Sequence, residues 1–170
     1  MNYLQLFNDN SIPITWTSIL IGIEGPGKFN RLLEWEEIIQ YAIGEVNKQQ
    51  ECSELVNEIA FSYSSEGDLI YRLVAKLSNS ENIDREVELK KWIVIILSEK
   101  LKNTPQSPLY GMLYFTEFWE KFDYPEYSPH LVQGMGNEIK PEEYYSKGYY
   151  EKCALEHKQW ILHELKKIQE

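Results

Sequence analysis

The most suggestive chemical motif near the start of the chain is a glycine-rich segment, Gly22-Ile23-Glu24-Gly25-Pro26-Gly27-Lys28. It follows the apolar stretch Ile19–Ile21 and has the G-x-x-x-x-G-K spacing of a phosphate-binding loop, in which backbone N–H groups and a lysine face the phosphates. In that motif a Ser or Thr after the lysine holds magnesium, but here the position is Phe29, and Pro26 removes one N–H group. We therefore interpret the segment as a turn between two helices. A small phosphate- or nucleotide-binding enzyme that uses Gly22 to Lys28 is the alternative.

Cys153 and His157 are four residues apart, a spacing that places two potential zinc ligands on one helix face. A tetrahedral site needs further ligands, and we assign His130 to a loop and His163 to a different face. Because Cys153 and His157 also fall on an apolar face, the pattern favours a buried thiol and a half-buried imidazole. Cys52 is far from Cys153 in the sequence, so we expect two reduced thiols, no metal site and no cofactor.

Carboxylates are abundant, but acid–base catalysis requires two of them in one cleft with separated pKa values. Glu34, Glu36 and Glu37 fall together on one predicted helix, and a solvated acidic face is the simplest interpretation of that grouping. No catalytic residue is therefore assigned.

A second acidic group lies within residues 110–127, where tyrosine, phenylalanine and tryptophan are concentrated. One helix face cannot bury all of these rings, so the segment is either a wide aromatic core or a partner-binding surface. In the second case carboxylates steer the partner and tyrosines anchor it. The candidate contacts are Glu34, Glu36, Glu37, Asp123, Tyr124, Glu126 and Tyr127.

Helical periodicity dominates the first half of the chain, and no pair of alternating strands is joined by an Asn-Gly or Asp-Gly turn. Apolar stripes that begin at Leu32, Leu55 and Leu69 predict three helices, the third with Asp68 as its cap. We therefore expect an all-α fold, an irregular multi-helix bundle or a short helical-hairpin array, with a long loop near 123–140.

Three further helices are predicted in the second half. Residues 84–102 form the first, because charged flanks extend the apolar run Trp92–Leu97 past the length of a strand. Ser107-Pro108 supplies a cap and a first-turn proline for the second, and Pro141 opens a third that is interrupted near Gly148. The inner side of the second helix is predicted to carry Leu109, Met112, Leu113, Thr116, Trp119 and Phe122.

Length and composition fit one helical domain over residues 1–170, because 43% hydrophobic and 14% aromatic residues supply a core without disulfides. The longest apolar run, Trp92–Leu97, is far shorter than the roughly 20 residues of a membrane span. The first residues lack the basic and apolar regions of a secretory signal, so we expect a cytoplasmic protein.

The net charge of −10, from 27 acidic and 17 basic residues, is concentrated in the first half. Residues 1–85 hold 13 acidic and 6 basic side chains. Such a field repels nucleic-acid phosphates and anionic lipid and attracts basic proteins. We expect a basic protein partner, no nucleic acid and no membrane, with the oligomeric state left open.

Three segments carry a resemblance to a known family: Ile14-Thr15-Trp16, Leu33-Glu34-Trp35-Glu36-Glu37-Ile38-Ile39-Gln40-Tyr41-Ala42, and Phe118-Trp119-Glu120-Lys121-Phe122-Asp123-Tyr124-Pro125-Glu126. Together they resemble a family of bacterial proteins of about this length that is known as a domain of unknown function. The resemblance covers nearly the whole chain and brings no catalytic residues. By analogy with small acidic bacterial proteins that neutralise toxins, it implies a non-enzymatic, immunity-type protein that occludes a basic toxin. A helical scaffold subunit is a further alternative.

Overall fold

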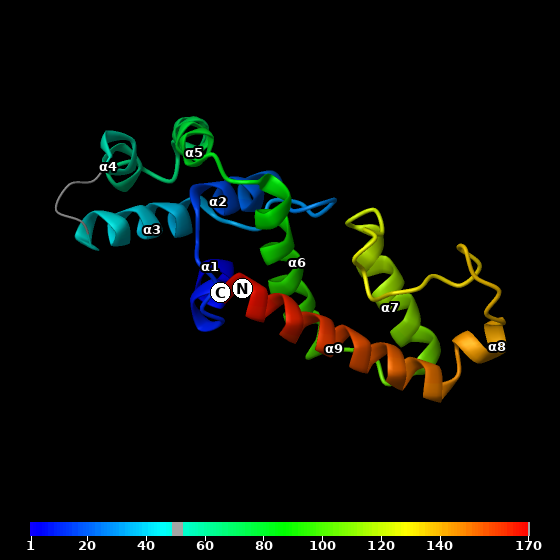
Figure 1. Ribbon diagram of the computed structural model, residues 1–170. Coiled ribbons are helices and arrows are strands. Elements are labelled where there is room, and N and C mark those ends of the chain that lie inside the picture. Colours follow the sequence, from blue (N-terminus) through cyan, green and yellow to red (C-terminus); the bar gives the residue numbers. More distant parts are fainter. Residues whose placement is uncertain (49–52, 170) are drawn as a thin grey trace. The chain divides into compact units, whose positions relative to one another are not determined.

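The structure is a computed structural model that describes residues 1–48 and 53–169, so Cys52 lies outside the described residues. Within these ranges the chain is all-helical and contains no strand, which confirms the predicted fold class (Figure 1). It divides into two compact units, Met1–Ile93 and Val94–Glu170, with the boundary inside helix α6 (Arg85–Leu101). None of the described helices is both long enough and apolar enough to cross a bilayer.

Unit 1 is built around buried aliphatic side chains and the indole of Trp92. Helix α2 packs against α5, and α3 packs against α4. The Trp92 N–H donates to the backbone oxygen of Ser18 (2.8 Å), and its ring meets Phe7 edge-on with centroids 5.0 Å apart. The helices of this unit before α6 are α1 (Tyr3–Asp9), α2 (Trp16–Glu24), α3 (Trp35–Lys48), α4 (Glu54–Ala60) and α5 (Gly67–Glu81).

The N-terminus of α2 is held by a carboxylate from another helix. Thr15 and Ser18 form a capping box at its first turn. In addition, Glu81 at the end of α5 accepts hydrogen bonds from the backbone N–H groups of Trp16 and Thr17, both 2.8 Å long. Because the first N–H groups of a helix lack partners within it, this carboxylate both satisfies them and fixes α2 to α5.

A buried ion pair fixes the start of α6 to the segment before α2. The ammonium of Lys91 lies 2.7 Å from the carboxylate of Glu88. Glu88 also accepts from the Thr15 hydroxyl (2.8 Å), and Lys91 donates to the backbone oxygen of Pro13 (3.2 Å). The pair is therefore hydrogen-bonded on both sides, as a buried pair must be to offset its loss of hydration.

Unit 2 contains the second half of α6 and an aromatic core. Helix α9 (Lys147–Gln169), orange to red in Figure 1, packs against α7 (Pro108–Glu120) and α8 (Pro141–Tyr144). As predicted, Ser107 is the N-cap of α7, Pro108 opens it, and no helix lies between α7 and α8. The central buried side chains are Met112, Phe115, Tyr144 and Cys153.

The predicted Asp68 cap is wrong, and the break predicted near Gly148 is present but lies slightly earlier in the chain. Helix α5 begins at Gly67 with Glu66 as N-cap, so Asp68 lies in the first turn and is not the cap. Gly67 is required there because a Cβ atom would lie 2.6 Å from the Trp35 indole. The last helical segment breaks at Tyr145, before α9 begins, and Gly148 lies inside α9.

The predicted inner side of α7 is also partly wrong. Leu109 and Leu113 are 44% and 39% exposed, whereas Phe115 and Phe118 are buried. The reason is a close contact with α9: a Cβ atom on Gly111 would lie 2.2 Å from the Tyr150 ring. This contact selects the face of α7 that is buried, and α7 carries large apolar residues on more than one face, so periodicity alone could not select it.

Candidate functional site

The glycine-rich segment forms the turn between α2 and α3. Gly22 is inside α2, where a Cβ atom would collide with Trp92 at 2.5 Å. Gly25 and Gly27 have positive φ angles of 95° and 59°, and α3 begins only at Trp35. A phosphate loop needs a helix that starts at the lysine, so that its free N–H groups face the phosphates. Here the helix precedes the loop, and the prediction of a turn between two helices is confirmed.

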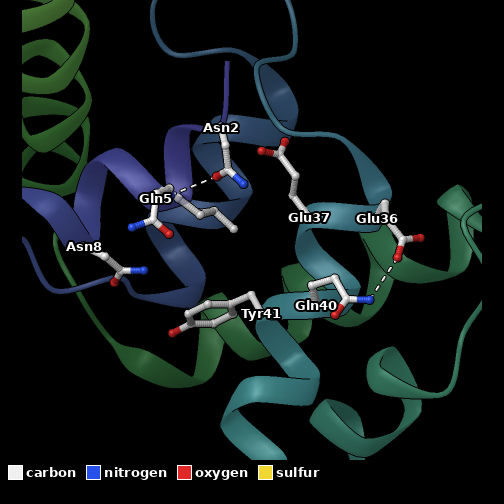
Figure 2. Close-up of a pocket in the computed structure, with 8 residues that line it drawn as sticks. Asn2, Gln5, Asn8, Glu36, Glu37, Gln40 and Tyr41 are labelled. Atoms are coloured by element: carbon white, nitrogen blue, oxygen red, sulfur yellow. Dashed lines mark hydrogen bonds between the residues drawn. The ribbon is translucent and has the colours of Figure 1, made fainter.

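A polar pocket of about 410 Å3 lies between α1 and α3 (Figure 2). Two of the candidate contact residues predicted from the sequence, Glu36 and Glu37, line this pocket. The α1 side of the pocket was not anticipated, because the sequence gives no reason to pair the first residues with α3. The lining residues are Asn2, Leu4, Gln5, Asn8, Glu36, Glu37, Gln40 and Tyr41.

Glu34 and Glu36 are exposed and Glu37 is half-buried, as expected for a solvated acidic face, and each of the three also has a hydrogen-bonding or ionic partner. Glu34 precedes the helix, and its backbone N–H donates to the carboxylate of Glu37 (2.9 Å) in half of a capping box. The Glu34 carboxylate pairs with Arg31 at 2.9 Å. Glu36 accepts from the side-chain amide of Gln40 at 3.0 Å. Glu34 does not line the pocket.

The other candidate contacts lie in unit 2, directly after α7. The backbone N–H of Asp123 donates to the backbone oxygen of Glu120 (3.2 Å), and the backbone N–H of Tyr124 donates to the backbone oxygen of Trp119 (3.1 Å). These are the two hydrogen bonds of a Schellman motif. Asp123 and Tyr124 have φ angles of 56° and 50°, in the left-handed region that usually requires glycine. Asp123 and Glu126 are exposed.

Tyr127 rests on an aromatic stack that leads into the core of unit 2. Its ring is nearly parallel to that of Trp160, with centroids 6.2 Å apart and an angle of 12°. Trp160 in turn meets Trp119 edge-on at 5.4 Å, and Trp119 is fully buried. Tyr127 itself is 40% exposed. Tyr127 therefore packs against Trp160 and still exposes part of its ring, so the aromatic segment contributes both to the core and to the surface of unit 2.

The structure also brings together three groups that the sequence separates. His130, from the long loop, lies beside Cys153 and His157, and their ligand atoms are within 4.8 Å of one another. The Cys153 sulfur is 3.6 Å from Nδ1 of each histidine. His130 was correctly assigned to a loop, but no spacing rule indicates that this loop returns to α9. All three residues are buried, and His157, predicted to be half-buried, is 0% exposed.

Hydrogen bonds fix the proton positions on His157. The Trp119 indole N–H donates to its Nε2 (2.8 Å), so that nitrogen carries no proton. Nδ1 therefore holds the proton and donates to the backbone oxygen of Cys153 (2.7 Å). A metal bound at Nδ1 would move the proton to Nε2, where it would face the indole N–H. The arrangement therefore opposes coordination through His157.

The protons on His130 are fixed in the same way. The Thr116 hydroxyl donates to the backbone oxygen of Met112 (3.0 Å), so its oxygen accepts from Nε2 of His130 at 2.8 Å. Nδ1 of His130 is then the acceptor for the Cys153 thiol. The Tyr144 hydroxyl donates to the backbone oxygen of Leu131 (2.7 Å) and so holds the loop that contains His130 against α8.

Burial keeps this network neutral. It lowers the pKa of His130 to about 3, with the neighbouring His157 adding to the shift, and lowers the pKa of His157 to about 4. It raises the pKa of Cys153 to about 12, with Glu156 contributing. A nucleophilic cysteine needs a thiolate. The cluster is therefore a satisfied polar core that attaches the long loop to α7 and α9.

Residues 4–165 match the model of a bacterial family described as an uncharacterized protein conserved in bacteria (DUF2247). The chain belongs to this family. The match covers nearly the whole chain, and the resemblance seen in the aromatic motifs is confirmed. No curated protein and no solved structure gives a significant match to this DUF2247 chain.

Proposed function

We propose that this protein is a non-enzymatic binding protein of the immunity type, which neutralises a basic toxin by covering its surface. The observation that carries the proposal is the loop Asp123–Tyr127, an acidic and aromatic surface whose conformation is set by the end of α7. Tyrosine combines apolar area with a hydrogen-bonding tip, and such residues dominate the energy of protein interfaces.

The loop is pre-organised for this role. Two successive left-handed residues, Asp123 and Tyr124, are followed by Pro125, which has a fixed φ angle. Non-glycine residues in this region cost folding free energy, on the order of 1 kcal/mol each. A surface that is already ordered loses less entropy on binding. The stacking of Tyr127 on Trp160 supports the same conclusion for its ring.

Charge supports a basic partner. Asp123 and Glu126 each directly precede a loop tyrosine, and the whole chain carries −10. Exposed charges of one sign accelerate association with a partner of the opposite sign and repel nucleic acid. The neutral cysteine and histidines of unit 2 and the position of the glycine-rich turn after a helix give no comparable support to an enzyme.

The test is binding to a basic toxin encoded beside this gene, first by co-purification and then by kinetics. Tyr127→Ala should raise the dissociation rate about tenfold or more, because it removes a supported anchor. Glu126→Gln should mainly lower the association rate and its sensitivity to salt. Tyr110→Ala and Glu142→Gln, which alter exposed residues of unit 2 outside the loop, are the matched controls.

Asp123→Asn and Tyr124→Ala complete the series. If all four loop variants fold and leave both rate constants unchanged, the loop is not the interface. Thermal stabilisation by magnesium ATP or GTP that disappears in Lys28→Ala would instead support the nucleotide-binding alternative.

A further inference from the structure

The pocket between α1 and α3 has a chemistry of its own. Its volume of about 410 Å3 is within the range of small ligand sites, and seven of its eight lining residues carry a polar group beside a substantial apolar area. Figure 2 shows Gln5 of α1 and its N-cap Asn2 across the pocket from Tyr41 of α3, while the Gln40 amide turns toward Glu36. The hydrogen-bonding groups of these side chains determine which ligand fits the pocket.

Both glutamines are exposed, and each donates from its side-chain amide to a neighbouring carboxylate. Gln5 donates from its NH2 group to Asp9 (2.7 Å), and Gln40 donates from its NH2 group to Glu36 (3.0 Å). A carboxylate only accepts hydrogen bonds, so neither amide can be turned around without losing its partner. Each glutamine therefore keeps its carbonyl oxygen for other donors, and in Figure 2 the Gln5 oxygen points toward the open space.

Glu37 adds a negative charge to these acceptors. One of its oxygens receives the Glu34 backbone N–H, and its side chain lines the pocket. The pocket lies in the half of the chain in which 13 acidic residues oppose 6 basic ones. A ligand that fits this wall carries positive charge and several N–H donors.

Tyr41 provides a ring on the same wall. Its hydroxyl is directed to the backbone oxygen of Ile14 (3.3 Å). Burial raises the pKa of Tyr41, with Glu45 and Glu81 adding to the shift, so the hydroxyl stays neutral and keeps its proton. The Tyr41 ring meets Trp16 edge-on at 5.3 Å on one side and also lines the pocket, and aromatic rings attract planar cations.

We propose that this pocket binds the guanidinium group of an arginine side chain. Guanidinium is planar, always charged and offers five N–H donors, for which the Gln5 carbonyl and the Glu37 carboxylate are acceptors on the pocket wall. A lysine ammonium has only three donors and cannot stack on a ring as a plane. The inference rests on the proposed function for the source of the arginine, which is the basic partner protein.

The experiment uses the full chain and N-acetylarginine amide as the probe, with binding followed by amide chemical shifts. We expect saturable binding with shifts at α1 and α3. N-acetylcitrulline amide, which has the same shape without the charge, should bind at least about tenfold more weakly, as expected for loss of a charge-assisted hydrogen bond. Equal binding of the citrulline or lysine analogue would overturn the proposal.

Glu37→Gln is the test variant, because glutamine can still accept the Glu34 N–H and preserve the start of α3. It should weaken arginine binding about tenfold. Glu45→Gln removes the same charge from the same helix outside the pocket and should not. Unchanged affinity in Glu37→Gln would overturn the proposal. Partner capture without binding of the probe would defeat the pocket alone, and probe binding without any protein partner would defeat the proposed function alone.

Discussion

At the Cys153–His157 pair, chemistry depends on which atom holds each proton. The spacing of the two residues permits a metal site or a nucleophile, but the Trp119 indole occupies Nε2 of His157 and the Cys153 backbone occupies Nδ1. Nδ1 of His130 then accepts a hydrogen bond from the Cys153 thiol. Each group is paired in its neutral form, and a buried network of this kind loses free energy when any member becomes charged.

This network predicts acid sensitivity. The pKa values of His130 and His157 are about 3 and 4 in the folded chain and near 6.5 when unfolded. Below about pH 6.5 the unfolded chain therefore binds more protons than the folded chain. The free energy of unfolding is highest above that pH and falls as the pH decreases. Between pH 7 and pH 5 we expect a loss of about 2 kcal/mol for each histidine, measured by urea unfolding.

Two variants isolate the cause. His157→Gln keeps an acceptor for the Trp119 N–H and should remove about half of the pH dependence. His163→Gln changes an exposed histidine and should leave it unaltered. A free energy of unfolding that is constant from pH 7 to pH 5 in the wild-type protein would contradict the neutral network.

At the level of a single helix, the end of α7 has a backbone conformation that favours glycine but a sequence that places other residues there. A Schellman motif places its left-handed residue at Asp123, where glycine is the usual choice. The bonds of the motif satisfy carbonyl groups at the end of the helix.

The variant Asp123→Gly should therefore stabilise the protein. Glycine adopts positive φ without steric cost, and we expect a gain of about 0.5–1 kcal/mol in the free energy of unfolding, reduced from the full cost because aspartate tolerates this region. Asp123→Ala removes the carboxylate but keeps the Cβ atom, so it should give no gain. If alanine stabilises as much as glycine, the carboxylate and not the backbone is the cause.

At the scale of the whole molecule, α6 belongs to both units, since the boundary falls between Ile93 and Val94 in the middle of the helix. A helix cut at its centre loses hydrogen bonds across the cut and must nucleate again. If residues 1–170 form one domain, as the sequence predicts, the two units should therefore unfold together.

We predict a single unfolding transition. Ile70→Ala in unit 1 and Phe115→Ala in unit 2 both remove fully buried side chains and should each cost about 2–5 kcal/mol. Each should lower the midpoint of the whole transition, followed by circular dichroism and by tryptophan fluorescence. Two separate transitions, with each variant shifting only one, would show that the units unfold independently.

Local physics made much of this protein predictable from sequence. Helix periodicity, the Ser107-Pro108 start, the turn around Gly25 and the acidic charge all depend on residues within a few positions of one another. Their outcome does not require knowledge of the rest of the fold. For that reason the helical class and the long loop near 123–140 were predicted correctly, with errors of a few residues at helix ends.

Only the tertiary structure decided which distant groups meet. His130 reaches Cys153 across 23 positions, and Glu81 reaches the start of α2 across 65. The pocket exists because α1 lies beside α3, and the buried face of α7 follows from Tyr150 approaching Gly111. Spacing along the chain carries no information on such contacts, because they depend on the path of every intervening turn and on which side chains fit together.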